Sequence, residues 1–290
     1  MKMIVPVAVT SANIMAHSVA PDPESNWSSG LGYTAGNRVI HDAMIYEAVA
    51  DSAAKTPGTG TEWLAVHPIA KLRPFDTKLT TFVGAVDGAI EYEILMPKNG
   101  NAIAIFGMSG TSVRIEVPEQ GFDRTIDLPN QSLIDRWWEW FYGERITTPE
   151  LILEDVPAYL GSTVKITVTG AGVSEIVIGN AVHLGETLAG TTVSFRDFST
   201  KEQNTFGDFE VVRRGYSVTI DYSFFVLFDQ VRDVQRLVAA RRATPTVYYA
   251  GPDTDHFGTT TYGISDDLRG ALIGNGGTTF SLNTEGLKKW

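Results

Sequence analysis

The sequence contains no cysteine, which excludes disulfide bonds, thiol catalysis and cysteine-ligated metals. Histidines are few and scattered, and none forms an HxxH, HxxxH or HExxH pair: His17, His41, His67, His183 and His256. A histidine metal site would therefore need residues that are far apart in the sequence. We expect no metal site and no cofactor.

The chain also lacks a surplus of basic residues. Its 34 acidic residues outnumber its 23 basic residues, which gives a net charge of -11. Proteins that bind nucleic acids normally carry a basic surplus, so we expect no nucleic-acid partner. No apolar run approaches the roughly 20 residues of a membrane helix. The apolar opening 1–9 is interrupted by Pro6, which predicts a strand rather than a signal peptide, and no membrane insertion.

Familiar catalytic and phosphate-binding motifs are missing as well. Residues 107–110 read Gly-Met-Ser-Gly, which is not a Gly-x-Ser-x-Gly nucleophile elbow. Residues 170–172 read Gly-Ala-Gly, which we interpret as a hairpin turn rather than a dinucleotide-binding loop. Residues 253–258 begin like a calcium loop, but Phe257 and Ile264 occupy positions that need oxygen ligands. We predict a protein that is not an enzyme and has no catalytic residues.

What the sequence does contain is many short segments with period-two alternation, which predict a mainly β protein. Glycine, asparagine and proline turns separate them, as is typical of an antiparallel sandwich or jelly roll. The predicted strands are 90–94, 103–106, 113–117, 163–169, 216–222, 246–249 and 279–282.

Two segments have helical periodicity instead. A Trp-rich helix is predicted to begin after Asn130 and to end at Gly143. Its apolar face would carry Leu133, Ile134, Trp137, Trp138 and Phe141. A second helix is predicted from the apolar stripe between Phe224 and Val238, and Pro245 ends it.

Changes in composition divide the chain into four predicted segments. Residues 1–24 form an N-terminal strand and a proline-containing linker, and residues 25–67 form a small β module. Residues 68–195 form a β-sandwich domain with the Trp-rich helix, and residues 196–290 form an α+β domain.

The spacing of aromatic residues in 25–67 carries a family resemblance. Trp27, the Tyr33-x-x-Gly-x-x-Val strand, Tyr46 and Trp63 resemble the small chitin- and cellulose-binding modules of carbohydrate-binding families five and twelve. The resemblance implies a minute β-sheet whose core is built by these rings, because so small a domain has little other apolar area.

The sugar-binding members of these families carry exposed rings after the second tyrosine. Residues 47–55 of this chain contain no aromatic residue. Trp27, Tyr33, Tyr46 and Trp63 are therefore candidates for the module core or for carbohydrate contact.

The order of motifs along the whole chain carries a second resemblance. It includes Trp-Trp-Glu-Trp-Phe-Tyr at 137–142, Phe-Arg-Asp-Phe-Ser at 195–199, Phe-Gly-Asp at 206–208 and Arg213-Arg214. This layout is similar to tail structural proteins of tailed bacteriophages, and the last third is similar to distal tail proteins. The resemblance implies a virion protein, made in the host cytoplasm, that forms part of a tail-tip or baseplate ring.

The same resemblance implies the partners. They are other copies of the chain, usually six in distal tail proteins, and neighbouring tail-tube and tail-hub proteins. An alternative function is an adsorption protein that binds host-surface polysaccharide through the small module. A third alternative is a polysaccharide hydrolase with a binding module, which would need two carboxylates across a cleft.

Arginine residues of the last third are candidates for the assembly interface, because an acidic chain that self-associates gains from opposite-sign contacts. They are Arg213, Arg214, Arg232, Arg236, Arg241 and Arg242. The alternative is that these arginines decorate a solvated helix face and its C-terminus.

Overall fold

The computed structural model describes residues 1–53, 55–128, 150–203, 205–251, 258–271 and 276–289. The predicted Trp-rich helix at 130–142 and the calcium-loop-like residues 253–257 lie outside the described residues. The described chain is mainly β, as predicted, with one α-helix, α2 (Val231–Ala240), and two short 3₁₀ helices, η1 (Ala70–Phe75) and η2 (Pro118–Gln120). No helix in these ranges is both long and apolar enough to cross a membrane.

The largest element is a curled ten-stranded sheet whose described pairings are all antiparallel. Its strands come from the beginning, the middle and the end of the chain. In spatial order they are β14 (Glu150–Ala158), β11 (Gly100–Phe106), β16 (Glu175–His183), β1 (Lys2–Pro6), β22 (Thr246–Tyr249), β23 (Thr261–Ala271), β24 (Gly277–Gly286), β21 (Tyr216–Leu227) and β17 (Glu186–Thr187), with β18 (Thr192–Asp197) also paired to β21.

Strand β1 lies in the interior of this sheet and joins its two halves. Ile4 is opposite Ala181 of β16 on one side and opposite Val247 of β22 on the other. Met3 and Ile4 are fully buried, one in each of two different apolar clusters. The large sheet therefore contains strands from three of the four predicted segments. Residues 1–24, 68–195 and 196–290 do not form separate sheets.

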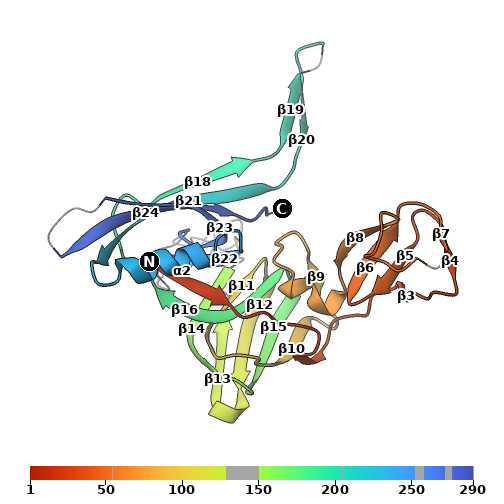
Figure 1. Ribbon diagram of the computed structural model, residues 1–290, viewed down its shortest axis with the longest axis horizontal. Coiled ribbons are helices and arrows are strands. Elements are labelled where there is room, and N and C mark those ends of the chain that lie inside the picture. Colours follow the sequence, from red (N-terminus) through yellow and green to blue (C-terminus); the bar gives the residue numbers. More distant parts are fainter. Residues whose placement is uncertain (54, 129–149, 204, 252–257, 272–275, 290) are drawn as a thin grey trace, which may run out of the picture.

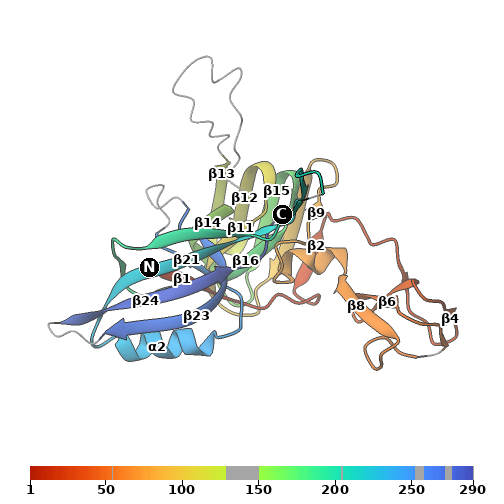
Figure 2. The ribbon, with the colours of Figure 1, turned by 90° about the horizontal axis from the view of Figure 1, so that it is seen from above.

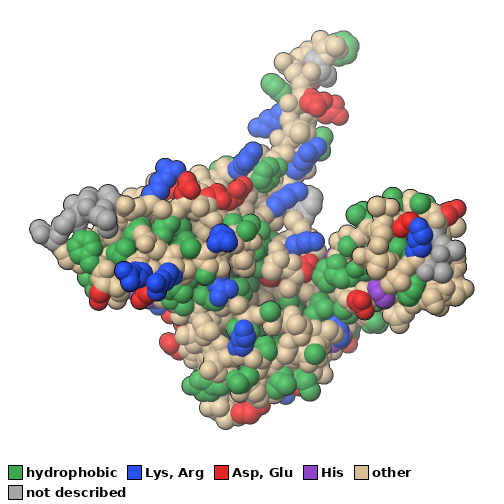
Figure 3. All heavy atoms as spheres, in the orientation of Figure 1, with side chains coloured by type: hydrophobic (Ala, Val, Ile, Leu, Met, Phe, Trp, Pro, Cys, Tyr) green, Lys and Arg blue, Asp and Glu red, His purple; other side chains and the backbone are tan. Residues whose placement is uncertain are grey.

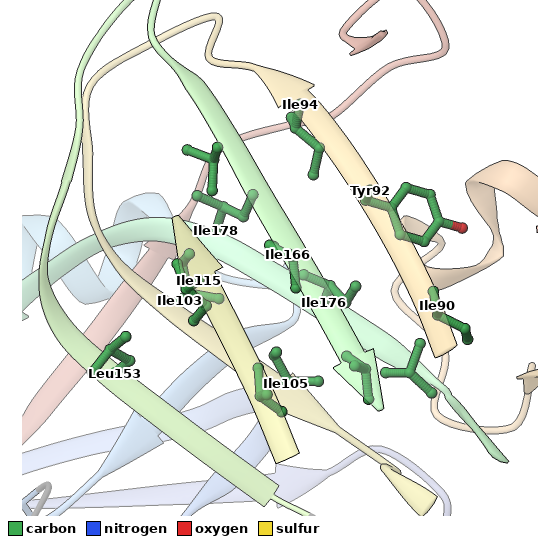
Figure 4. Close-up of a cluster of buried hydrophobic side chains, with 14 of the residues drawn as sticks. Ile90, Tyr92, Ile94, Ile103, Ile105, Ile115, Leu153, Ile166, Ile176 and Ile178 are labelled. Carbon is green, nitrogen blue, oxygen red and sulfur yellow. The ribbon is translucent and has the colours of Figure 1, made fainter. Parts of the chain in front are cut away.

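A second sheet packs against the β11–β14–β16 end of the first and forms a sandwich (Figures 1 and 4). Its strands are β13 (Phe122–Asp127), β12 (Ser109–Val117), β15 (Thr163–Val173), β10 (Ala89–Leu95) and β2 (Ile14–His17), with β9 (Val83–Gly84) paired to β15. Alternation explains the packing, because Val164, Ile166 and Val168 of β15 are buried while Lys165 points outward. Ile103 and Ile105 of β11 face them from the other sheet.

Helix α2 covers the other part of the large sheet (Figure 2). Val234 and Val238 are its buried residues, and they belong to one apolar cluster with Met3, Tyr222 and Leu282. The helix therefore buries a narrow stripe and leaves its other faces in solvent.

Residues 25–68 form a compact module beside the sandwich (Figures 1 and 2). One small sheet contains β3 (Ser25–Asn26), β5 (Arg38–His41), β6 (Met44–Ala48) and β8 (Trp63–Pro68), and another contains β4 (Gly32–Tyr33) and β7 (Ser52–Ala53). A hydrogen-bonded ion pair of the buried Asp22 with Arg73 of η1 links the segment before the module to the segment after it.

The second predicted helix begins later than its apolar stripe indicated. Phe224 and Leu227 lie in strand β21, and α2 starts only at Val231. The run Phe-Phe-Val-Leu-Phe at 224–228 is apolar at every position, so its pattern fits a buried strand as well as a helix. Residues 224–227 form a strand because they pair with β24.

The Gly-Ala-Gly at 170–172 is not a hairpin turn, because β15 continues through it to Val173. Gly170 (φ 148) lies where the register between β15 and β12 shifts. A Cβ atom on Gly170 would come within 2.2 Å of the Cα of Gly110. The glycines therefore allow two backbones to approach closely inside the sheet.

Candidate functional site

A long antiparallel hairpin leaves the body of the protein between residues 192 and 221. Its proximal part is the pairing of β18 with β21. Its distal part is the pairing of β19 (Thr200–Gln203) with β20 (Phe209–Val212). Figure 1 shows this distal part, residues 199–214, pointing away from the large sheet and from the module. We call residues 199–214 the arm.

Large apolar side chains of the hairpin are exposed. Phe195 of β18 is 74% exposed, Phe209 of β20 is 71% exposed, and Phe206 near the turn is 89% exposed. A two-stranded ribbon has no third layer to cover such rings, and an isolated hairpin is marginally stable in water at best. Large apolar side chains that are exposed next to one another are unusual on a protein surface.

A groove of about 720 Å³ lies where the arm joins the body. Its apolar lining includes Phe195, Val211 and Val218, and its basic lining consists of Lys201, Arg213 and Arg214. The groove is therefore both apolar and positively charged.

Hydrogen bonds at Ser199 fix the junction beside this groove. The backbone N–H of Arg214 donates to Ser199 Oγ at 3.0 Å, and the backbone N–H of Ser199 donates to Asp197 Oδ1 at 2.8 Å. The bonds from Ser199 hold the pKa of Asp197 below its usual range, and Lys201 and Arg213 lower that pKa further. Asp197 is therefore ionised at neutral pH. Among the lining residues that the structure describes, three cations outnumber this carboxylate.

The outer part of the arm, residues 202–210, which we call the distal arm, carries the opposite charge. Residues 202–210 include Glu202, Asp208 and Glu210 and no basic residue. Glu202 and Glu210 lie directly opposite each other in the ladder, where two like charges destabilise a hairpin. In the described chain neither glutamate forms a salt bridge. Figure 3 shows basic side chains nearer the body and acidic and apolar side chains toward the end of the arm.

The six arginines predicted as an assembly interface fall into two groups. Arg213 and Arg214 lie at the base of the arm and line the groove. The others are on α2 or directly after it: Arg232, Arg236, Arg241 and Arg242. The fold therefore does not gather all six into one surface.

Within the α2 group the environments differ. Arg232 and Arg236 are exposed on the helix, and Arg242 is exposed after it. Arg241 is half-buried and lines a pocket of about 330 Å³ that also contains Glu175. Arg241 consequently belongs partly to the interior, whereas Arg232 and Arg236 are ordinary surface residues.

The aromatic residues of the small module form its core. Tyr33 and Trp63 are buried, with ring centroids 5.3 Å apart in an edge-to-face arrangement. The Trp63 Nε1–H donates to the carbonyl oxygen of Lys55 at 2.9 Å. Trp27 and Tyr46 are half-buried and pack against this cluster. None of the four side chains is fully exposed to solvent.

Two acidic side chains that are far apart in sequence meet in the body. The Oε1 atom of Glu175 accepts hydrogen bonds from the backbone N–H of Thr77 and from the Tyr262 hydroxyl, both at 3.1 Å. Burial raises the pKa of Glu175, and the charge of the nearby Asp76 raises it further, to about 9. Burial also raises the pKa of Asp76. Glu175 is therefore protonated at neutral pH and occupies the interior as a neutral acid.

Asp76 and Glu175 alone supply fewer ligands than a metal site usually needs. Among the residues that the structure describes, no group of three or more histidine, aspartate or glutamate side chains is arranged to hold a metal ion.

Comparison of the chain with protein-family models, with curated proteins and with solved structures finds no significant match.

Reasoning from the sequence missed the exposed phenylalanines of the hairpin and the Glu202–Glu210 pair. A partial signal was present in the turn Thr-Phe-Gly-Asp at 205–208, where Gly207 has a positive φ, but residues 200–203 are polar at every position and show no alternation. What the sequence does not contain is the information that no other strand covers this ribbon.

Proposed function

We propose that this protein is a structural subunit of a bacteriophage tail, which assembles with other copies of itself into a ring at the tail tip or baseplate. Its location is the virion, after synthesis in the host cytoplasm, and its other neighbours are tail-tube and tail-hub proteins. The similarity of its motif order to tail proteins supports the proposal. The single observation that carries it is the exposed apolar arm beside a basic groove.

The physical reason is the cost of leaving such an arm in water. Phe209 in the arm and Phe195 in β18 at its base expose most of their rings, although burial of an aromatic side chain is strongly favourable. A monomer gains nothing from a projecting ribbon of this kind. A subunit of an assembly gains a directional contact that buries the rings only after association.

The alternative of sugar recognition by the module has less support. Sugar-binding surfaces stack aromatic rings on the ligand, whereas Tyr33 and Trp63 are buried in the module core and Trp27 and Tyr46 pack against it. The module is more consistent with a spacer or a contact surface within the assembly.

Electron microscopy of the purified chain tests the proposal. Negatively stained particles at increasing protein concentration should include closed rings, and light scattering should give a mass that is a multiple of one chain. Peptides of the chain should also be present in purified tailed particles from the source of the gene. A chain that stays monomeric at every concentration and is absent from such particles contradicts the proposal.

A further inference from the structure

We infer that the distal arm of one copy docks in the basic groove at the arm base of the next copy, with the carboxylate pair Glu202–Glu210 facing the guanidinium pair Arg213–Arg214. The inference rests on the proposed self-assembly and specifies the contact that would produce it. Charge complementarity between two surfaces of the same chain identifies the partner as a second copy.

The carboxylate pair needs an external cation. Glu202 and Glu210 are directly opposite in the ladder, both exposed, and neither forms a salt bridge within the described chain. Two adjacent carboxylates on one face of a ribbon repel each other. Guanidinium groups suit such a pair, because each can donate two parallel hydrogen bonds to a carboxylate.

The groove supplies that match. Arg213 and Arg214 are exposed, line the groove next to the apolar Phe195 and Val218, and form no salt bridge within the described residues. An acidic ribbon with an exposed phenylalanine at its turn fits a groove that is basic and apolar. The two surfaces therefore complement each other in charge and in hydrophobicity.

The arm cannot fill its own groove. Lys201 and Val211 line the groove and are also paired with each other in the arm ladder. Glu202 and Glu210 are the next pair outward on the same stiff ribbon. To bring the turn back to the groove, the chain would have to break the ladder that forms the arm. The occupant must come from another molecule.

The contact joins two different surfaces of the chain, the distal arm and the groove, and it is heterologous when each copy offers them to two different neighbours. Heterologous contacts build rings when the rotation closes and open filaments when it does not. Two copies that exchanged arms with each other would form a two-fold dimer, so the ring of the proposed function requires that the arm and the groove of each copy engage different neighbours.

Charge exchange between copies tests the inference. One variant carries Glu202→Lys and Glu210→Lys, and a second carries Arg213→Glu and Arg214→Glu. Each alone should weaken self-association by about tenfold or more, measured by sedimentation against concentration. A third variant with all four changes should assemble again. An equimolar mixture of the first two variants should also assemble, because the arm of each variant then carries the charge opposite to that of the other variant's groove.

The mixture separates this contact from an interaction within one chain. If the fourfold variant assembles but the mixture does not, the two pairs meet inside a single copy and the inference is wrong. A control variant, Arg232→Glu with Arg236→Glu, makes the same charge change on exposed positions of α2 and should assemble like the wild type. An equal loss in this control would attribute the effect to net charge and overturn the inference.

The remaining outcomes are also distinguishable. Wild-type assembly that persists unchanged in both pair variants overturns the tip-to-groove contact and leaves the proposed function standing. A wild-type chain that never self-associates contradicts the proposed function and the inference together. Thermal unfolding of each variant should match the wild type, since all four side chains are exposed.

Discussion

Burial keeps Glu175 protonated in the folded protein at a pH where it is ionised in the unfolded chain. Its pKa rises from 4.5 to about 9 in the folded state, first through desolvation and then through the nearby Asp76. Below pH 4.5 the carboxyl is protonated in both the folded and the unfolded chain. Between pH 4.5 and about 9 the unfolded chain releases this proton and the folded chain retains it, so the free energy of unfolding falls as the pH rises.

Replacement of Glu175 by Gln should remove this contribution to the pH dependence. The amide oxygen can still accept the hydrogen bonds from Thr77 and Tyr262, while the group no longer ionises. We expect the variant to be more stable than the wild type at pH 8 and nearly equal at pH 4, measured by urea unfolding across that range. The exposed Glu91→Gln is the matched control and should follow the wild-type profile. Parallel profiles for Glu175→Gln and wild type would contradict the assigned protonation.

Trp63 carries much of the core of the small module. Truncation of this buried residue to alanine should cost about 3–5 kcal/mol, which exceeds what so small a core can lose. Limited proteolysis should then cut within residues 25–67 while the rest of the chain stays resistant. The neighbouring Leu64 is 60% exposed, so Leu64→Ala should leave the module intact. Equal resistance of both variants would show that the ring is not the core.

At the scale of elements, the arm is separable from the body. Its four ladder pairs contact each other and project beyond the large sheet. Replacement of residues 200–212 by a two-residue Asn-Gly turn should leave the melting temperature nearly unchanged and abolish self-association. Calorimetry and sedimentation on the same sample measure the two effects. A large fall in melting temperature would mean that the arm belongs to the folding core of the monomer.

The module gives a prediction about ligands. Because its four aromatic rings are buried or half-buried, it should bind chitin, cellulose or host polysaccharide no more tightly than about millimolar, a regime of few favourable contacts. Pull-down on insoluble polysaccharide and calorimetry with soluble fragments measure this. Micromolar binding that disappears when Trp27 or Tyr46 is replaced would favour the adsorption function instead.

Alternation predicts some of the longer described strands, and one segment shows why others could not be predicted in this way. Residues 90–94 and 163–169 alternate cleanly because one face packs in the sandwich and the other meets solvent. Residues 224–228 are apolar at every position, so their periodicity does not separate strand from helix. These residues form a strand because they pair with β24, which lies far away in the sequence. The pattern of neighbouring residues does not reveal such a distant partner.

The candidate site was less predictable than the fold. Arg213 and Arg214 stand out in the sequence, but their separation from Arg232 and Arg236 depends on how the hairpin and α2 leave the large sheet. Glu202 and Glu210 are eight positions apart in the sequence and become a pair only through the register of the ladder. Asp76 and Glu175 meet because two distant segments of the body pack together.

For the molecule as a whole, β1 makes the body one cooperative unit. Ile4 is fully buried and pairs with strands of both halves of the large sheet. Ile4→Ala should lower the free energy of unfolding by about 2–5 kcal/mol, and Ile4→Val by about 0.5–1.5 kcal/mol. Apart from the small module, unfolding should remain a single transition. Two body transitions, of which only one shifts, would show that the halves fold independently.

The position of β1 also has a consequence for synthesis on the ribosome. Its neighbour β22 lies almost a full chain length later, since Lys2 is opposite Tyr249. At roughly 5–20 residues per second, β1 waits on the order of 10 to 50 s for that partner. During this time at least one edge of β1 is unpaired, even after β16 has paired with its other edge, and an unpaired edge can join a neighbouring nascent chain. The yield of folded protein therefore depends on how well this strand is shielded until β22 has been synthesised.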